Sequence, residues 1–117
     1  MTVGTIFLCL VASVTDGDTL RCEDGTRVRL AAIDAPEIRG CRGRPGRVCV
    51  PGDGQASRRR LEQITARRVI RCESTGTSYG RVTAWCTIDG IDLSCAMVRG
   101  GHAVTDARYD RQRRICR

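Results

Sequence analysis

Two carboxylates and an arginine lie at positions where a folded core has little use for charge. Asp18 follows a tight turn, Asp34 ends a run of alternating apolar residues, and Arg29 lies inside that run. If the chain pairs in antiparallel fashion around the intervening Asp-Gly turn, Asp18 and Asp34 come close together. Neighbouring carboxylates repel each other unless a cation lies between them or one takes up a proton. A hard cation with oxygen ligands and several waters satisfies this arrangement, and we expect Ca²⁺.

The elements that must position these residues are short strands joined by Asp-Gly turns. Alternating apolar residues predict five strands, over residues 5–15, 19–22, 27–33, 69–73 and 82–88. A helix is predicted from its N-cap residue Asp53 to about residue 67, and a second helix over residues 92–99. The basic tail over residues 109–117 predicts the start of a third helix.

This order of elements favours one fold class. Five short strands with a helix between the third and the fourth indicate a β-rich α+β fold, a five-stranded, partly open OB-fold barrel with two to three helices. A chain of 117 residues is expected to form a single domain over residues 1–117. One Trp, one Phe and two Tyr are too few for a broad base-stacking platform, so any nucleic acid contact would depend on charge.

The charge of the chain is carried by arginine. All 20 basic side chains are Arg, and the formal net charge is +7. Guanidinium groups are planar, permanently charged forks that suit bidentate contacts with phosphate. This excess favours a polyanionic partner, although solubility alone explains it about as well.

Eight cysteines bear on compartment and stability. No pair is spaced as Cys-x-x-Cys and the chain has one His, which argues against structural zinc. Their number favours disulfides and a secreted or periplasmic protein, with buried free thiols as the alternative. Cys41 and Cys49 are the pair we expect to be bonded, because they flank a Gly/Arg/Pro-rich loop. The first residues show no signal peptide and too short an apolar run to span a membrane, so we expect a strand there and no membrane partner.

Several fragments, in this order, resemble the staphylococcal nuclease (thermonuclease) family. They are Asp16-Gly17-Asp18-Thr19, the run Val28-Arg29-Leu30-Ala31-Ala32-Ile33-Asp34-Ala35-Pro36-Glu37, the triplet Tyr79-Gly80-Arg81, and Ala96-Met97-Val98-Arg99-Gly100-Gly101-His102-Ala103. The resemblance covers roughly residues 8–109. Either aspartate alone would be better explained as a turn cap, but the joint pattern is specific.

The resemblance implies an enzyme with defined roles for eight residues. It implies Ca²⁺ ligands at the carboxylates of Asp18 and Asp34 and at the main-chain carbonyl of Ala35. It implies that Arg29 and Arg81 hold the phosphate and that Glu37 activates or orients the attacking water. It implies substrate contacts at Tyr79 and Tyr109. The implied activity is Ca²⁺-dependent hydrolysis of phosphodiester bonds in single-stranded or frayed DNA and RNA, leaving 3′-phosphate ends, by a monomer.

Departures from the family pattern and competing interpretations remain. Ala107 replaces an aromatic residue expected two positions before Tyr109, and Ser78 replaces a basic residue before Tyr79. The main alternative is a non-catalytic OB-fold module that binds nucleic acid or a protein, and another is a disulfide-linked cationic protein that binds polyanions or membranes. Degenerate members of the family usually lose the arginines or the glutamate. This chain retains Arg29, Arg81 and Glu37, which favours the enzyme.

Overall fold

The computed structural model describes residues 1–39, 49–106, 108 and 113–116. Within them the strands are β1 (Ile6–Asp16), β2 (Thr19–Cys22), β3 (Arg27–Leu30), β4 (Ile33–Asp34), β5 (Val69–Ser78), β6 (Arg81–Ile88), β7 (Ile91–Asp92) and β8 (Val104–Thr105). The helices are α1 (Gly54–Thr65) and α2 (Leu93–Arg99).

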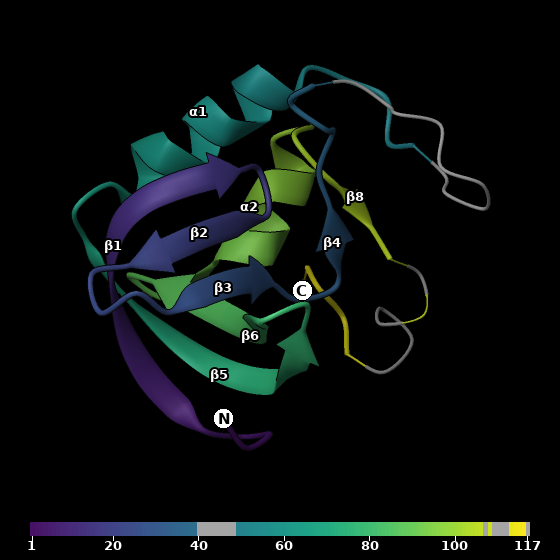
Figure 1. The fold of residues 1–117 in the computed structure, drawn as a ribbon. Helices are drawn as coiled ribbons and strands as arrows, with labels where there is room; N and C mark the ends of the chain where they lie inside the picture. The colour runs from purple at the N-terminus through teal and green to yellow at the C-terminus, as the bar shows by residue number, and fades with distance from the viewer. Residues whose placement is uncertain (40–48, 107, 109–112, 117) are drawn as a thin grey trace.

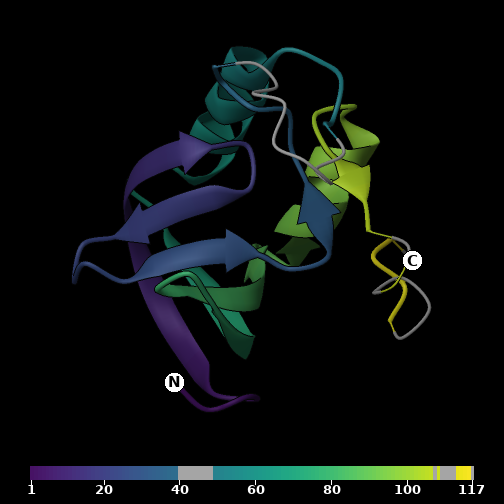
Figure 2. The same ribbon diagram turned by 45° about the vertical axis from the view of Figure 1, so that its right-hand side comes forward.

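Five strands form a closed, mixed barrel in the order β3-β2-β1-β5-β6, with β7 added beside β6 (Figure 1). The barrel closes because β3 pairs in parallel with β6, so that Val28, Arg29 and Leu30 lie opposite Val82, Thr83 and Ala84. The five-stranded OB-fold barrel predicted from the sequence is therefore confirmed. Its predicted openness is wrong, because the long-range β3–β6 ladder completes the ring. The short strands β4 and β8 pair separately beside it, as Figure 2 shows.

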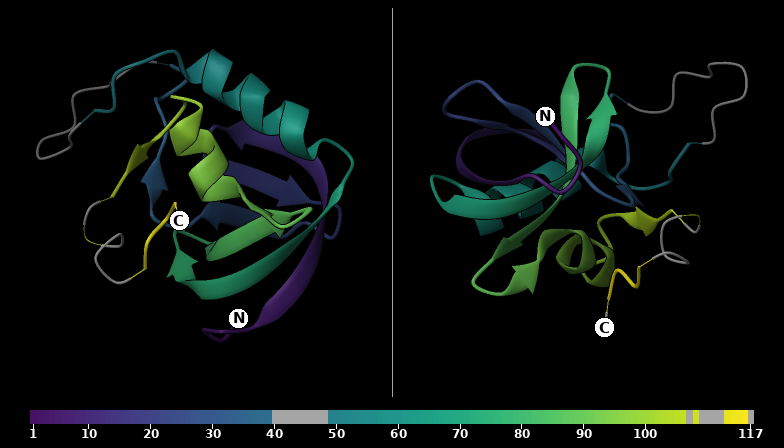
Figure 3. Two further views of the ribbon diagram at one scale, coloured as in Figure 1. Left: turned by 180° about the vertical axis from the view of Figure 1, so that it is seen from behind. Right: turned by 90° about the horizontal axis from the view of Figure 1, so that it is seen from below.

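The two helices cover the barrel and complete its core. Leu20, Val28, Leu30 and Ile70 point inward and are fully buried. Leu61 of α1 is also fully buried, and Figure 3 shows α1 and α2 on one side of the barrel, away from the N-terminus. Burial of these apolar side chains is the main driving force for closing the ring.

The predicted start of the first helix is confirmed. The predicted C-terminal helix is not observed in those of its residues that the structure describes. Oδ1 of Asp53 accepts hydrogen bonds from the backbone N–H of Gln55 at 3.0 Å and of Ala56 at 3.1 Å, as an N-cap does. Residues 113–116 are not helical. The other residues of that predicted helix lie outside the described part of the chain.

Two predicted strands have different limits. The strand predicted over residues 27–33 breaks after Leu30, because Ala32 adopts a left-handed conformation with φ of 66° and the chain then leaves the barrel. The strand predicted over residues 69–73 continues to Ser78. It does so because the tight Tyr79-Gly80 turn keeps β5 and β6 paired up to the Ser78–Arg81 pair.

Three disulfides are present among the described residues. Cys9–Cys22 links β1 to β2, Cys72–Cys86 links β5 to β6, and Cys95–Cys116 links α2 to the C-terminal segment. These bonds are compatible with an extracellular or otherwise oxidising compartment. The expected Cys41–Cys49 pair involves a residue outside the described part of the chain and stays a prediction. None of the helices in the described residues has the length and apolar character needed to cross a membrane.

Candidate active site

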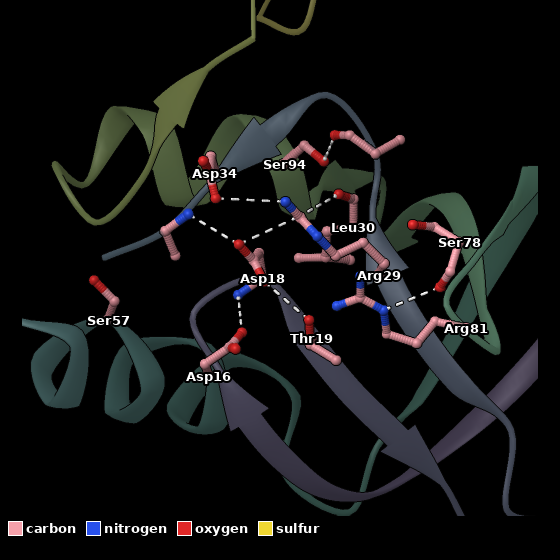
Figure 4. A network of polar contacts seen from close by, with 12 residues as sticks. Asp16, Asp18, Thr19, Arg29, Leu30, Asp34, Ser57, Ser78, Arg81 and Ser94 are labelled. Atoms are coloured by element: carbon pink, nitrogen blue, oxygen red, sulfur yellow. Dashed lines mark hydrogen bonds and ion pairs between the residues drawn. The ribbon is translucent and has the colours of Figure 1, made fainter. Parts of the chain in front are cut away.

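The hairpin of β2 and β3 brings the predicted acidic residues to one arginine. Thr19 pairs with Arg29, and the N–H of Leu30 donates to the carbonyl of Asp18 at 2.8 Å. As Figure 4 shows, Arg29 lies between two carboxylates: its Nη1 is 3.3 Å from Oδ2 of Asp18, and its Nη2 is 3.5 Å from Oδ1 of Asp34. The expected proximity of Asp18 and Asp34 is therefore found, with Arg29 as the cation between them.

The carboxylate of Asp18 is buried and held in place. Its Oδ1 accepts a hydrogen bond from the hydroxyl of Thr19 at 2.9 Å, and its Oδ2 accepts one from the N–H of Ala35, also at 2.9 Å. The side chain of Asp34 is about half exposed, at 51%. One carboxylate of the cluster is thus fixed by the protein, and the other faces solvent.

A third carboxylate, Asp16, was missed by the sequence analysis. It is the last residue of β1, and its Oδ1 accepts a hydrogen bond from the N–H of Asp18 at 3.0 Å. Burial, and then the hydrogen bond and negative charge of Asp18, raise the pKa of Asp16 to about 7. From the sequence alone, Asp16 is expected to be a turn residue next to Gly17. The signal was the second carboxylate two positions from Asp18.

Close packing against α1 sets the position of the turn and of the segment after β4. A Cβ at Gly17 would lie 2.7 Å from Cβ of Ser57 and 2.8 Å from Cβ of Ala35, so only glycine permits this approach. A Cβ at Gly54 would lie 2.5 Å from the carbonyl oxygen of Glu37. The helix therefore supports both the Asp18 turn and the chain that carries Ala35 and Glu37.

Arg81 and Tyr79 lie at the adjoining β5–β6 turn. Arg29 pairs with Thr83, two residues after Arg81, so both arginines lie on the outer face of neighbouring strands. The Nε–H of Arg81 donates to the carbonyl of Ser78 at 3.2 Å (Figure 4). Tyr79 has φ of 51° in the turn and is 91% exposed, so its ring faces solvent.

A small pocket adjoins Arg29. Its volume is about 200 Å³, and its lining includes Arg29, Ser78, Thr83, Asp106 and Arg108. Asp106 accepts from Nε and Nη2 of Arg108 at 3.1 and 2.8 Å, and these hydrogen bonds lower the pKa of the Asp106 carboxyl. Asp106 and Arg108 were not predicted as site residues, because only the fold places the segment after β8 beside Arg29.

The predicted site residues fall into three groups. The first group is linked by three contacts: Arg29 pairs with Asp18 and with Asp34, and the N–H of Ala35 donates to Asp18. Glu37 lies three residues beyond Asp34 and is exposed. Arg81 and Tyr79 lie at the neighbouring turn, and Tyr109 lies outside the described part of the chain.

The donor set is suited to a calcium ion. The described residues contain no cluster of three acidic, histidine or cysteine side chains that forms a ready-made metal cage. Ca²⁺ does not need one, because it also takes backbone carbonyls and waters as ligands. The carboxylates of Asp18 and Asp34 are hard oxygen donors that already share one positive charge, that of Arg29. The residues present therefore fit the ion.

Comparison with known proteins agrees with this geometry. The family model described as "Staphylococcal nuclease homologue" matches residues 27–115. The match includes Arg29, Asp34 and Arg81 and begins after Asp18, whose place in the site comes from the structure. No curated protein matches the chain. The chain therefore belongs to the family of staphylococcal nuclease homologues, whose fold suggests a nuclease-like function.

Proposed function

We propose that this protein is a Ca²⁺-dependent nuclease that hydrolyses phosphodiester bonds in single-stranded or frayed DNA and RNA and leaves 3′-phosphate ends. The observation that carries the proposal is the position of Arg29 between Asp18 and Asp34 at 3.3 and 3.5 Å. A partly exposed arginine that joins a buried and an exposed carboxylate is poorly explained by core packing. It is well suited to a site where a cation and an anion meet.

The acidic residues of the cluster would hold the metal ion. The ligands would be the carboxylates of Asp18 and Asp34 and the main-chain carbonyl of Ala35. Bound there, Ca²⁺ would neutralise negative charge on the phosphoryl oxygens. Asp18 is kept in position by its hydrogen bonds to Thr19 and to the N–H of Ala35.

The two arginines would hold the phosphate. Attack on a phosphodiester increases negative charge on the oxygens bound to phosphorus, and fixed guanidinium groups stabilise that charge most when they are already in place. Arg29 and Arg81 lie on the same outer face of β3 and β6. Glu37, exposed beyond Asp34, would accept the proton of the attacking water.

Substrate selection would depend on charge more than on base identity. Tyr79 is 91% exposed and offers one ring for stacking against a base, with Tyr109 as a second. Ala107 and Ser78 replace an aromatic and a basic residue of the family pattern, which predicts weak base preference. The net charge of +7 favours any single-stranded polyanion.

The proposal is tested by digestion of single-stranded DNA with Ca²⁺ and with a chelator. Arg29→Ala and Glu37→Gln are each expected to lower kcat/KM at least about a hundredfold. Arg59→Ala is the matched control, because it removes the same charge from the exposed face of α1 and is expected to retain activity. A control that loses as much activity as Arg29→Ala would mean that net charge, not this site, carries the effect.

A non-catalytic nucleic-acid-binding module is the second candidate. The observation that favours it is that Arg29 is held by the carboxylates that would bind the metal. Binding of single-stranded DNA without cleavage, with every divalent cation tried, would support this alternative.

A further inference from the structure

Three pockets follow one another along the outer face of β6. The first is the pocket at Arg29, and a second pocket, of about 520 Å³, shares Ser78 and Thr83 with it. The third pocket, of about 590 Å³, shares Arg113 with the second. Pockets that share lining residues adjoin one another. The three therefore form one trough, which begins at the candidate active site and ends at the C-terminal segment.

Alternate residues of β6 form one side of the trough. Thr83, Trp85 and Thr87 lie on the same face of the strand and line the first, second and third pockets in that order. A strand rises about 3.3 Å per residue, so β6 advances about 20 Å from Arg81 to Thr87. This length suits an extended strand of about four nucleotides, which is at the lower end of the site sizes found on OB-folds.

Arginine dominates the charged lining of the trough. Among the described residues, the three pockets are lined by two aspartates, Asp92 and Asp106, and by five arginines: Arg29, Arg99, Arg108, Arg113 and Arg114. Each aspartate is paired with one of these arginines. Arg71 and Glu73 of β5, opposite this part of β6, add one charge of each sign. The lining therefore carries a surplus of three positive charges.

Arg113 is held at the junction of the second and third pockets. Its guanidinium lies 4.2 Å from the centroid of the Trp85 ring, and its Nη2 is 3.9 Å from Oδ2 of Asp92. The Cys95–Cys116 disulfide anchors its segment to α2, and both views of Figure 3 place the C-terminal end of the chain beside α2. An arginine that is already held in place loses less conformational entropy when it contacts a phosphate. The trough thus has a preorganised anion-binding group away from the acidic cluster.

We propose that the trough binds the single strand of nucleic acid that extends from the candidate active site, with Arg113 and Arg114 contacting phosphates at its far end. The inference rests on the proposed function for the identity of the polyanion. A small anion would be satisfied by one pocket, whereas here positive charge recurs from Arg29 to Arg114 along a trough about 20 Å long. Regularly spaced phosphates fit such a distribution of charge.

Binding of a labelled oligothymidylate of about eight nucleotides, measured in chelator by fluorescence anisotropy, tests the trough. Arg113→Gln/Arg114→Gln is expected to raise Kd at least about tenfold at low salt. It is also expected to reduce the slope of log K against log salt concentration by about 1.4, because each phosphate contact with a single strand contributes about 0.7.

Arg59→Gln/Arg60→Gln is the matched control for this measurement. It removes the same charge from exposed positions of α1, and neither residue lines any of the three pockets in the described part of the chain. The control is expected to keep the salt slope of the unmodified chain. Equal changes of the slope in the two double variants, or no change in either, would overturn the proposal.

The emission of Trp85 tests the trough in the unmodified protein. Trp85 is the single tryptophan of the chain. Titration with the same oligonucleotide in chelator is expected to change its emission, because a phosphate at Arg113 alters the contact of the guanidinium with the ring. Unchanged emission at concentrations that saturate the anisotropy would place the strand elsewhere and overturn the proposal.

The trough and the proposed nuclease activity fail separately. Both binding measurements are made without Ca²⁺, so neither depends on cleavage. A chain that binds through the trough and does not cleave with Ca²⁺ would support the trough and contradict the nuclease. A chain that cleaves with Ca²⁺ while the two double variants bind alike would contradict the trough alone.

Discussion

Nη1 of Arg29 lies 3.3 Å from Oδ2 of Asp18, so the arginine expected to hold phosphate is already paired with the carboxylate expected to hold metal. The pair is largely buried, with side-chain exposures of 20% and 8%. Because the pairing neutralises a buried carboxylate, Arg29 contributes to stability before any ligand binds. In the proposed site, the same contact would link folding, metal affinity and phosphate binding in one residue.

Replacement of Arg29 is expected to lower the stability of the protein and to raise its affinity for Ca²⁺. In Arg29→Met the buried carboxylate of Asp18 loses its ion pair, and the free energy of unfolding in chelator is expected to fall by about 2 kcal/mol. No guanidinium then competes for the carboxylates, so Ca²⁺ is expected to bind more tightly than to the unmodified chain. Urea unfolding and calorimetric titration with Ca²⁺ measure the two effects. Weaker Ca²⁺ binding by Arg29→Met would show that the two cations do not share this site.

The close approach at Gly17 is expected to be sensitive to a single methyl group. Gly17→Ala introduces a Cβ at 2.7 Å from Cβ of Ser57, and a clash of this kind typically costs about 1–3 kcal/mol. The same substitution is expected to cost less in a Ser57→Gly background, where that carbon is absent. Urea unfolding of the four proteins in this double-mutant cycle gives the coupling. If the two substitutions have additive effects on the free energy of unfolding, the turn at Gly17 and Ser57 of α1 are not energetically coupled.

Asp92 is expected to make stability depend on pH. Burial raises the pKa of this carboxyl, which caps α2, so the folded protein holds the proton to a higher pH than the unfolded chain does. The stability that this group contributes is therefore lost as pH rises from its ordinary pKa of 3.8, which applies to the unfolded chain, through the higher pKa of the folded protein.

Asp92→Asn keeps an oxygen that can accept from the N–H of Cys95, as Oδ1 of Asp92 does at 3.0 Å, and removes the charge. The melting temperature of Asp92→Asn relative to the unmodified chain is expected to rise as pH increases from about 4 to about 7. Thermal unfolding monitored by circular dichroism across this range measures the difference. Parallel pH profiles for the two proteins would contradict the expectation.

The disulfide between Cys9 and Cys22 is expected to stabilise the hairpin that carries Asp18. The two cysteines are 13 residues apart and are buried. The loss of this loop constraint in Cys9→Ala/Cys22→Ala is expected to lower the free energy of unfolding by about 3 kcal/mol. Urea unfolding under oxidising conditions measures the change. An equal effect of a reducing agent on the unmodified chain and on the double variant would place the stabilisation in the other disulfides.

Local sequence patterns predict the strands and turns of this fold because they depend on neighbours in the chain. Alternation of apolar residues gives β1 and β2, and the N-cap at Asp53 gives the start of α1. The break in the third predicted strand was missed, because Ala rarely adopts the positive φ of 66° found at Ala32. Closure of the barrel was also missed, since it depends on a parallel ladder between distant segments.

The part of the candidate site that could be predicted consists of charged residues whose type and spacing in the sequence already point to a site. Asp18, Arg29 and Asp34 were selected together, and the structure brings them together. The raised pKa of Asp16 was not predictable, because it depends on burial and on the charge of Asp18. The Asp106 side of the Arg29 pocket depends on the placement of the segment after β8, which no local pattern encodes.

The most direct test of the account is the rate of cleavage of a single-stranded oligonucleotide, labelled at its 5′ end, as a function of Ca²⁺ concentration. Asp34→Asn serves as the variant that weakens the metal site while keeping Arg29. We expect cleavage that needs Ca²⁺, stops on chelation and yields 3′-phosphate ends, with Asp34→Asn needing a higher Ca²⁺ concentration. Cleavage that persists in chelator, or binding without cleavage at every Ca²⁺ concentration, would contradict the account.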